Sequence, residues 1–218
     1  MKYVRIAVLD KNDSALAYLD NLAPKALHYY DDEFHQYLKG AAYTYSFTCP
    51  ADHEDSQYMA EGNKIAFVYG QRGHYLNIVH AEKDEYEIAV ECYGLVFELL
   101  NEETGAYAAA SAMTFAQYLT VFDPEGTVTL GVNEVAEKAI TNEWTGTETV
   151  LSRLSSLATV FGAEIEFVTE LNDDYSLKRI IANVYREHSD DYQGIGQYRT
   201  DFTLRYGREI TGIRKTSD

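Results

Sequence analysis

Alternation of apolar and polar residues predicts a series of short β-strands in the first hundred positions. The strands predicted in this way are 3–8, 43–48, 64–69, 74–80 and 86–100. Pro50 ends the second of them, and a turn bounded by Gly70 and Gly73 joins the third to the fourth. We expect residues 10–19 to form a turn with a short excursion, and residues 52–57 to form a loop. So many short strands separated by turns indicate a small antiparallel β-barrel or sandwich.

The pattern changes after residue 101. Within residues 107–122, the apolar positions Phe115, Tyr118, Leu119 and Phe122 recur at helical spacing. We therefore predict a helix over this segment, ended by the turn residues 123–126. A domain boundary is expected at this turn.

The second half contains one strongly patterned helix. Thr145 and Glu148 match a capping box, in which Thr145 would cap the helix. Gly162 follows as a natural C-terminal cap. The apolar stripe of this helix consists of Val150, Leu151, Leu154, Leu157, Ala158 and Phe161. Strands are predicted over residues 164–169, 175–187, 201–206 and 209–214. This half is typical of a helix packed on an antiparallel sheet.

The predicted fold class is therefore α+β and mostly β. We expect an antiparallel β-barrel domain at residues 1–103, a helical connection at 104–126 and an α+β domain at 127–218. The last segment ends shortly after a predicted strand, so we expect this domain to be truncated at its C-terminal end.

The net charge of −17 narrows the possible partners. A protein that binds duplex DNA needs a cationic surface to displace counterions, and an anionic membrane repels an acidic chain. We therefore predict no stable nucleic-acid binding and no membrane insertion. The 19 tyrosines suit strands whose rings pack while their hydroxyls stay hydrated.

The N-terminus and the cysteines bear on the compartment. The apolar run after Met1 is too short for a signal peptide, so we expect synthesis in the cytoplasm without a classical export signal. Cys49 and Cys92 form no metal-binding motif and are compatible with a disulfide or with two buried thiols. A reducing compartment favours the thiols.

Candidate chemistry is sparse along the chain. The sequence contains no nucleophile elbow, no HExxH helix and no P-loop, so no catalytic or cofactor-binding residue is predicted. The groups 53–55 and 188–191 each combine a histidine with carboxylates, but their spacing is that of solvated loops and no metal site is predicted. The acidic groups 31–33 and 173–174 lack the EF-hand pattern. Glu164 and Glu166 share one strand face, where a solvated sheet surface explains them better than acid–base catalysis.

Aromatic residues offer a second kind of site. Trp144 is either a binding anchor or a staple that packs the helix entry, and the staple is favoured. The tyrosine-rich strands could form a carbohydrate platform, although strand packing and subunit contacts explain them better.

Several segments together resemble the N-terminal region of phage tail hub proteins. These segments are the first predicted strand, 30–34, 38–47, 61–65 with the hairpin that follows it, 90–101, 144–154, 161–167 and 202–213. The family is that of prophage tail endopeptidases, tail-associated lysins or minor structural proteins of Gram-positive phages. The resemblance implies a fold similar to the hub of contractile-phage baseplates, in which small β-barrels and α+β modules trimerise around the tail channel.

The resemblance also implies a function and partners. We expect a non-enzymatic, structural component of a phage or prophage tail tip in the virion, acting as a homotrimer that closes the tail tube. Its partners would be the distal tail ring and tail tube proteins, and it would position C-terminal cell-wall-directed modules absent from this sequence. The alternatives are a cell-wall hydrolase, which needs a cleft of convergent histidine, cysteine or carboxylate groups, and a carbohydrate-binding module.

Overall fold

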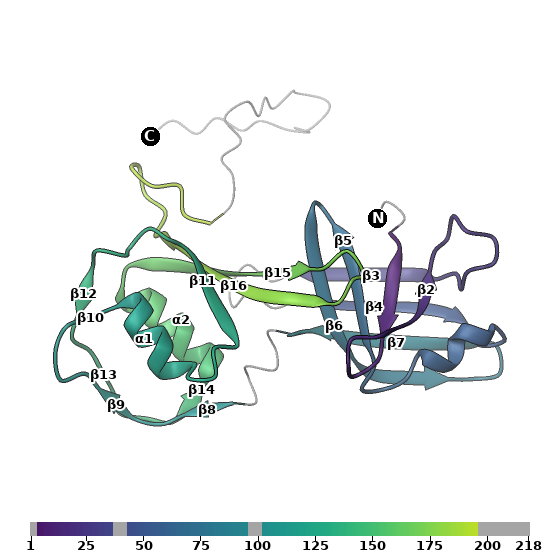
Figure 1. Cartoon of the computed structure of the whole chain (residues 1–218), viewed down its shortest axis with the longest axis horizontal. Coiled ribbons are helices and arrows are strands. Elements are labelled where there is room, and N and C mark those ends of the chain that lie inside the picture. The colour runs from purple at the N-terminus through teal and green to yellow at the C-terminus, as the bar shows by residue number, and fades with distance from the viewer. Residues whose placement is uncertain (1–3, 37–42, 96–101, 196–218) are drawn as a thin grey trace, which may run out of the picture.

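A computed structural model describes residues 4–36, 43–95 and 102–195 of the chain. Strands account for 49% and helices for 14% of the described residues, so the predicted mostly-β α+β fold is confirmed. The chain forms two lobes, and a long hairpin reaches from the second lobe to the first (Figure 1).

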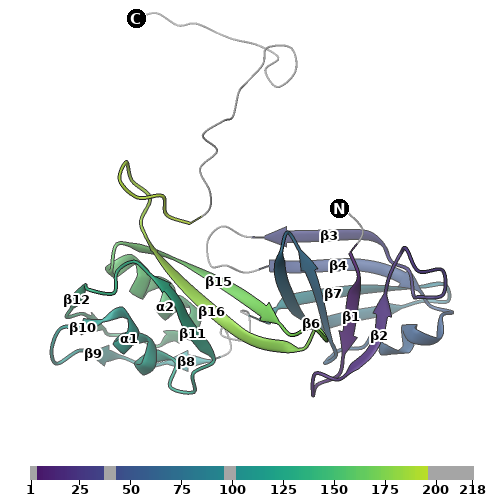
Figure 2. The same ribbon diagram turned by 45° about the horizontal axis from the view of Figure 1, so that its top comes forward.

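The first lobe is one curled antiparallel sheet of seven strands. Its elements are β1 (Ile6–Leu9), β2 (Ala15–Leu19), β3 (Tyr30–Gln36), β4 (Tyr43–Pro50), the 3-10 helix η1 (Glu54–Tyr58), β5 (Lys64–Tyr69), β6 (Arg72–Lys83) and β7 (Glu87–Gly94). Their order across the sheet is β2-β1-β5-β6-β7-β4-β3. The curl is visible when the molecule is turned (Figure 2).

Strict alternation builds the core of this lobe. Along β4, Tyr43, Tyr45, Phe47 and Cys49 are buried, whereas the residues between them are only half-buried. These four side chains enter a hydrophobic cluster to which every strand of the lobe contributes. In the described residues, an isolated bridge from Leu19 to Leu27 is the only pairing of the β2 end with the chain leading into β3. Closure into a small barrel therefore stays a prediction.

The predicted hairpin of the first lobe is confirmed. Gly70 and Gln71 connect β5 to β6, and both have positive φ (59° and 67°). Two consecutive left-handed residues match the right-handed twist of the flanking strands, which explains the glycine at this position. Two other predictions for this lobe were wrong, because residues 15–19 form β2 and the predicted loop at 52–57 contains η1.

The second lobe combines two helices with short and long strands. Its elements are β8 (Glu103–Thr104), β9 (Tyr107–Ala108), β10 (Met113–Thr114), α1 (Phe115–Phe122), β11 (Val128–Asn133), β12 (Ala139–Ile140), β13 (Glu143–Trp144), β14 (Glu148–Thr149), α2 (Val150–Val160), β15 (Ala163–Leu171) and β16 (Leu177–Arg186). The strand pairs β8–β14, β9–β13 and β10–β12 form an interrupted antiparallel ribbon that passes around the helices (Figure 1). No helix in the described residues has the length and apolarity needed to cross a bilayer.

Helix α1 is shorter than predicted. It begins after Thr114, which accepts a hydrogen bond from the Gln117 N–H, while the Gln117 side chain returns to the Thr114 backbone. The predicted start at residue 107 is wrong because Tyr107 and Met113 pair with strands β13 and β12 instead. The predicted apolar face is confirmed, since all four of its residues are buried.

Helix α2 also begins later than the sequence suggested. Thr149 caps it by accepting a hydrogen bond from the Ser152 N–H at 3.2 Å. The predicted cap at Thr145 is wrong because Glu148 lies in strand β14 and forms an ion pair with Arg153. Gly162 ends the helix with φ of 61°, as expected of a C-terminal glycine.

The hairpin β15–β16 joins the two lobes into one ten-stranded sheet. The two strands pair over their whole length, and β15 adds a single residue pair, Thr169 with Gly73, to β6 of the first lobe. Strand β11, which was not predicted, pairs with β16 in the parallel sense. The antiparallel sheet expected of this half is therefore completed by one parallel edge strand. The strands predicted at 201–206 and 209–214 lie outside the described residues.

One hydrophobic cluster continues across both lobes. It unites the helices of the second lobe with Ala7, Ala66 and Tyr75 from the outer face of the first sheet, and Leu171 and Leu177 of the hairpin pack against it. Strand β1 was predicted to be half-buried, but all four of its residues are buried because the second lobe covers its other face.

Candidate functional site

The histidine and carboxylate groups singled out in the sequence form no metal site. No cluster of three potential ligands occurs in the part of the chain that the structure describes. His53 caps η1, with its Nδ1 accepting from the Asp55 N–H at 3.1 Å. The Nδ1 of His188 lies 3.1 Å from the Gln193 carbonyl oxygen. Both histidines therefore stabilise local turns.

The acidic groups have similar local roles. Asp31 has a φ of 51° at a bulge in β3, and the Tyr45 hydroxyl donates to Asp32 at 3.4 Å. Asp174 accepts hydrogen bonds from the backbone and the hydroxyl of Ser176, which lowers the pKa of its carboxyl. These interactions order turns and strand edges.

Glu164 and Glu166 each have a separate partner. The carboxylate of Glu166 pairs with Arg72 at 2.5 Å, and that of Glu164 accepts from the Ile195 N–H at 2.7 Å. The predicted solvated sheet face is thus a paired one. Each carboxylate therefore has a structural partner of its own, and the two are not arranged as an acid–base pair.

Trp144 is buried between the helices. Its ring packs edge-on against Tyr118 and Phe122, and its indole N–H donates to the Ser156 hydroxyl at 3.0 Å. This placement agrees with the predicted packing role and leaves the ring inaccessible to a ligand. The fully buried Arg153 lies over the same ring and donates to the carbonyl of Gly146.

The two cysteines are buried, free thiols on β4 and β7. Burial raises the pKa of Cys49 to about 11 and raises that of Cys92 further. Neither thiol is activated as a nucleophile, since only the thiolate attacks.

The junction of the two lobes is the most distinctive site of the structure. The Tyr43 hydroxyl lies 3.2 Å from the Tyr75 carbonyl oxygen, 3.4 Å from the Tyr75 N–H and 3.3 Å from the Thr169 hydroxyl. It therefore bonds backbone groups of β6, and it contacts the second lobe as well. Gly94 leaves room for this ring, because a Cβ at that position would lie 2.8 Å from it.

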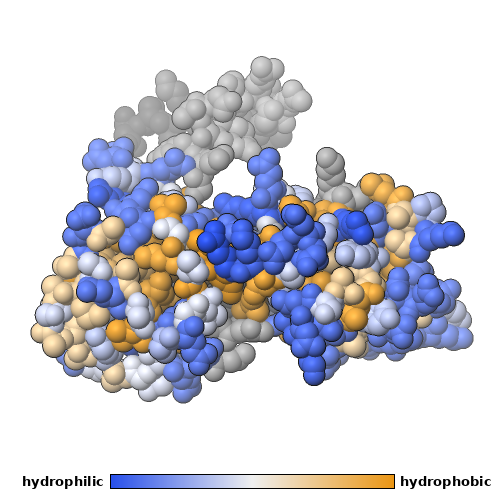
Figure 3. Space-filling model, viewed as in Figure 1, coloured by the Kyte–Doolittle hydropathy of each residue, from blue (hydrophilic) through white to orange (hydrophobic). Residues whose placement is uncertain are grey.

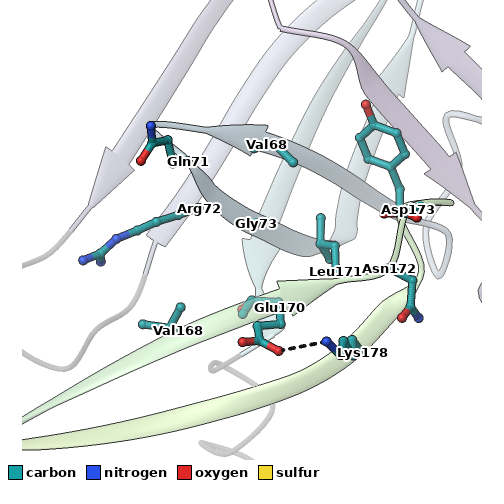
Figure 4. A pocket seen from close by; sticks show the side chains of 12 residues that line it. Val68, Gln71, Arg72, Gly73, Val168, Glu170, Leu171, Asn172, Asp173 and Lys178 are labelled. Carbon is teal, nitrogen blue, oxygen red and sulfur yellow. Dashed lines mark ion pairs between the residues drawn. The ribbon is translucent and has the colours of Figure 1, made fainter. Parts of the chain in front are cut away.

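A groove of about 530 Å³ lies between the tips of the two hairpins (Figure 4). Val68, Gln71 and Arg72 line it from the first lobe, and Leu171 points toward them from the second. Hydrophilic side chains gather over the middle of this face, where β15 and β16 reach the first lobe (Figure 3). On these two strands, Glu170 pairs with Lys178 at 3.5 Å and with Arg179 at 2.8 Å.

A polar network fixes the far end of the second hairpin. Asp13, in the tight turn after β1, accepts hydrogen bonds from the Tyr75 hydroxyl and from Lys64, and it is also bonded by the Leu177 backbone. Burial alone would raise the pKa of Asp13, but these donors outweigh it and lower the pKa. The tip of β16 is thereby tied to the first lobe.

This junction was not predicted from the sequence. Residues 43 and 169, or 72 and 166, are far apart along the chain, and a single sequence contains no signal that pairs them. The glycines at 73 and 94 gave a partial signal, since glycine in a strand often marks a close approach. At Gly73 a Cβ would lie 2.8 Å from Leu171.

Comparison with known proteins identifies the fold. No protein-family model and no curated protein matches the chain. Among solved structures, a tail protein from Neisseria meningitidis MC58 has a TM-score of 0.53 at 14% identity, over 84% of this chain and 50% of that one. Prophage tail protein gp18 from Listeria monocytogenes EGD-e has a TM-score of 0.53 at 13% identity, over 82% of this chain and 50% of that one. A chain in a PdpA–VgrG complex from Francisella has a TM-score of 0.51 at 10% identity, over 87% of this chain and 32% of that one.

The chain therefore has the fold of phage tail proteins, and the resemblance stated from the sequence is confirmed at the level of the fold. It spans about half the length of the two tail proteins.

Proposed function

We propose that this chain is a structural component of a phage or prophage tail tip. Three copies would form a hub that closes the tail tube and positions C-terminal cell-wall-directed modules. The observation that carries the proposal is the shared fold with tail proteins of Neisseria and Listeria. The function is geometric, because a hub ends the tube and sets the direction of the parts attached to it.

The proposed partners follow from this position. The chain would contact two further copies of itself, the distal tail ring and the tail tube, and would reside in the virion. A Francisella chain of similar fold is found in a complex between VgrG and PdpA, which supports an assembly role for this fold. We propose a non-enzymatic role because the solved structures of the same fold include tail proteins.

Within the hub, the chain would act through three segments. Residues 1–103 would form the barrel domain, whose sheet closes in the assembly, and residues 104–126 would connect it to the α+β domain at 127–218. The cluster that unites Ala7 and Ala66 with the second lobe supports this proposal, since it packs the first segment against the last.

The charge of the chain suggests how DNA would pass. With a net charge of −17, an acidic channel wall would repel the phosphate backbone and let DNA slide without sticking. The acidic side chains are then expected to line the lumen of the trimer. Finding them on its outer surface, with a neutral or basic lumen, would rule out this part of the proposal.

Immunogold electron microscopy of purified particles tests the location. Antibodies raised against this chain should label one end of the tail, at the tip distal to the capsid. Label along the whole tube, or particles without label whose lysate contains the soluble protein, would contradict a tip component. A glycan-array screen of the same protein should give no binding, whereas specific glycan binding would favour a carbohydrate-binding module.

A further inference from the structure

His74 lies inside the first lobe, next to the point at which the lobes join. It follows Gly73, the residue of β6 that pairs with Thr169 of β15. Only 4% of His74 is exposed, and its Nδ1 has no hydrogen-bond partner among the described residues. A buried polar atom without a partner is rare in folded proteins and requires a physical explanation.

Aromatic rings enclose this imidazole. The ring centroids of Phe34, Phe67 and Tyr43 lie 4.8, 5.1 and 5.3 Å from that of His74. Tyr43 is also the residue whose hydroxyl contacts Thr169 at 3.3 Å. Tyr43 therefore lies between His74 and the contact that its hydroxyl makes with the second lobe.

The surroundings favour the neutral imidazole. Burial lowers the pKa of His74 to about 4, a hydrogen bond with the Tyr69 backbone opposes this, and the positive charge of Arg72 adds to it. The other titratable groups on the surrounding strands are the phenols of Tyr43, Tyr45 and Tyr69, and burial raises the pKa of Tyr43 and of Tyr45. The nearby carboxylates are engaged elsewhere: the contacts are Glu33 with His35, Asp32 with Tyr45 and Glu166 with Arg72.

We propose that His74 makes the joint between the lobes acid-sensitive. A proton on Nδ1 adds a charge to a buried site in which this nitrogen has no hydrogen-bond partner among the described residues, so the imidazolium is driven out of its cage. Tyr43 then loses its position, its hydroxyl leaves Thr169, and the β15–β16 hairpin loosens from β6. Both ends of the joint remain folded, because each lobe keeps its other core contacts.

Distance measurement between the lobes tests this proposal independently of any role in a tail. Glu85 and Glu137 are exposed residues of the first and second lobes, and Cys49 and Cys92 are buried. Dyes attached to Glu85→Cys and Glu137→Cys should report a change in energy transfer with a midpoint at about pH 4. The His74→Phe variant, which retains a ring but cannot take a proton, should show no change. The control His35→Phe should respond like the parent protein, since the His35 side chain is 53% exposed.

Three results would overturn the proposal. They are an unchanged transfer in the parent protein, the same change in His74→Phe, and loss of far-UV circular dichroism at the same midpoint, which indicates global unfolding. If His74→Phe does not fold, proton NMR of the parent protein decides. The His74 signal should titrate together with the energy transfer, and titration near pH 6.5 without a change in transfer would refute the proposal.

Discussion

The Tyr43 hydroxyl and the Thr169 hydroxyl lie 3.3 Å apart although 126 positions separate them in the chain. This contact, together with the pairing of Gly73 with Thr169, joins the curled sheet of the first lobe to the hairpin of the second. The Tyr43 hydroxyl also bonds the main chain of β6, because it donates to the Tyr75 carbonyl oxygen and accepts from the Tyr75 N–H.

Removing this hydroxyl should therefore destabilise the protein more than removing a hydrogen bond at the surface would. In Tyr43→Phe, the buried hydrogen bonds of this hydroxyl to the Tyr75 backbone and to Thr169 are lost, and we expect the free energy of unfolding to fall by about 1–3 kcal/mol. Urea titration measures the loss. Tyr86→Phe is the matched control, since Tyr86 is 75% exposed, and it should unfold like the parent protein. Equal stability of all three proteins would contradict the role given to Tyr43.

Replacing Gly94 with a larger residue should destabilise the protein. In Gly94→Ala, the new Cβ would lie 2.8 Å from the Tyr43 ring, so the ring has to shift and stability should fall by about 1–3 kcal/mol. Gly105→Ala meets nothing within 4 Å and serves as the control. Thermal unfolding of both variants gives the comparison. A Gly94→Ala protein as stable as Gly105→Ala would show that the ring is not confined.

Arg153 should be essential to the second lobe. Its fully buried guanidinium pairs with Glu148 and donates to the carbonyl of Gly105 at 3.2 Å. Arg153→Met leaves these acceptors without their donor, and we expect a loss of about 2–4 kcal/mol in unfolding experiments. Arg179→Met breaks an exposed pair with Glu170 and should leave the unfolding curve in place. The reverse order of effects would refute this account of the lobe.

Stability should depend on pH through His74. Its pKa in the folded protein, about 4, lies below the ordinary value of 6.5, so between these values the unfolded chain binds more protons. Stability from this group is thus complete above pH 6.5 and is lost as the pH falls toward 4, by at most about 3 kcal/mol. Urea titrations at several pH values should show this slope in the parent protein and a smaller slope in His74→Phe. Equal slopes would show that other groups cause the acid sensitivity.

Local patterns predicted much of the secondary structure but not its boundaries. The alternation at 43–49 was sufficient to predict strand β4, and the apolar stripe was sufficient to predict helix α2. Both patterns arise because burial on one face leaves a periodic signal. The Ala-rich segment before α1 has strong helix propensity, yet pairing of Tyr107 with Trp144 overrides it. The Thr114–Gln117 capping box was visible in the sequence and would have placed the start of α1 correctly.

The joint between the lobes could not be predicted in the same way. Tyr43 with Thr169 and Arg72 with Glu166 are long-range pairs, and their chemistry is common enough to leave no trace in one sequence. The burial of Ala7 on β1 likewise depends on a cluster that it shares with residues of the second lobe, far along the chain.

Light scattering coupled to size exclusion, over a range of protein concentrations, tests the central claim most directly. A structural hub made of three copies predicts a mass of three times 24.7 kDa, or a monomer–trimer equilibrium that shifts with concentration. A mass that stays at 24.7 kDa up to the highest concentration would contradict self-assembly of this chain into a hub.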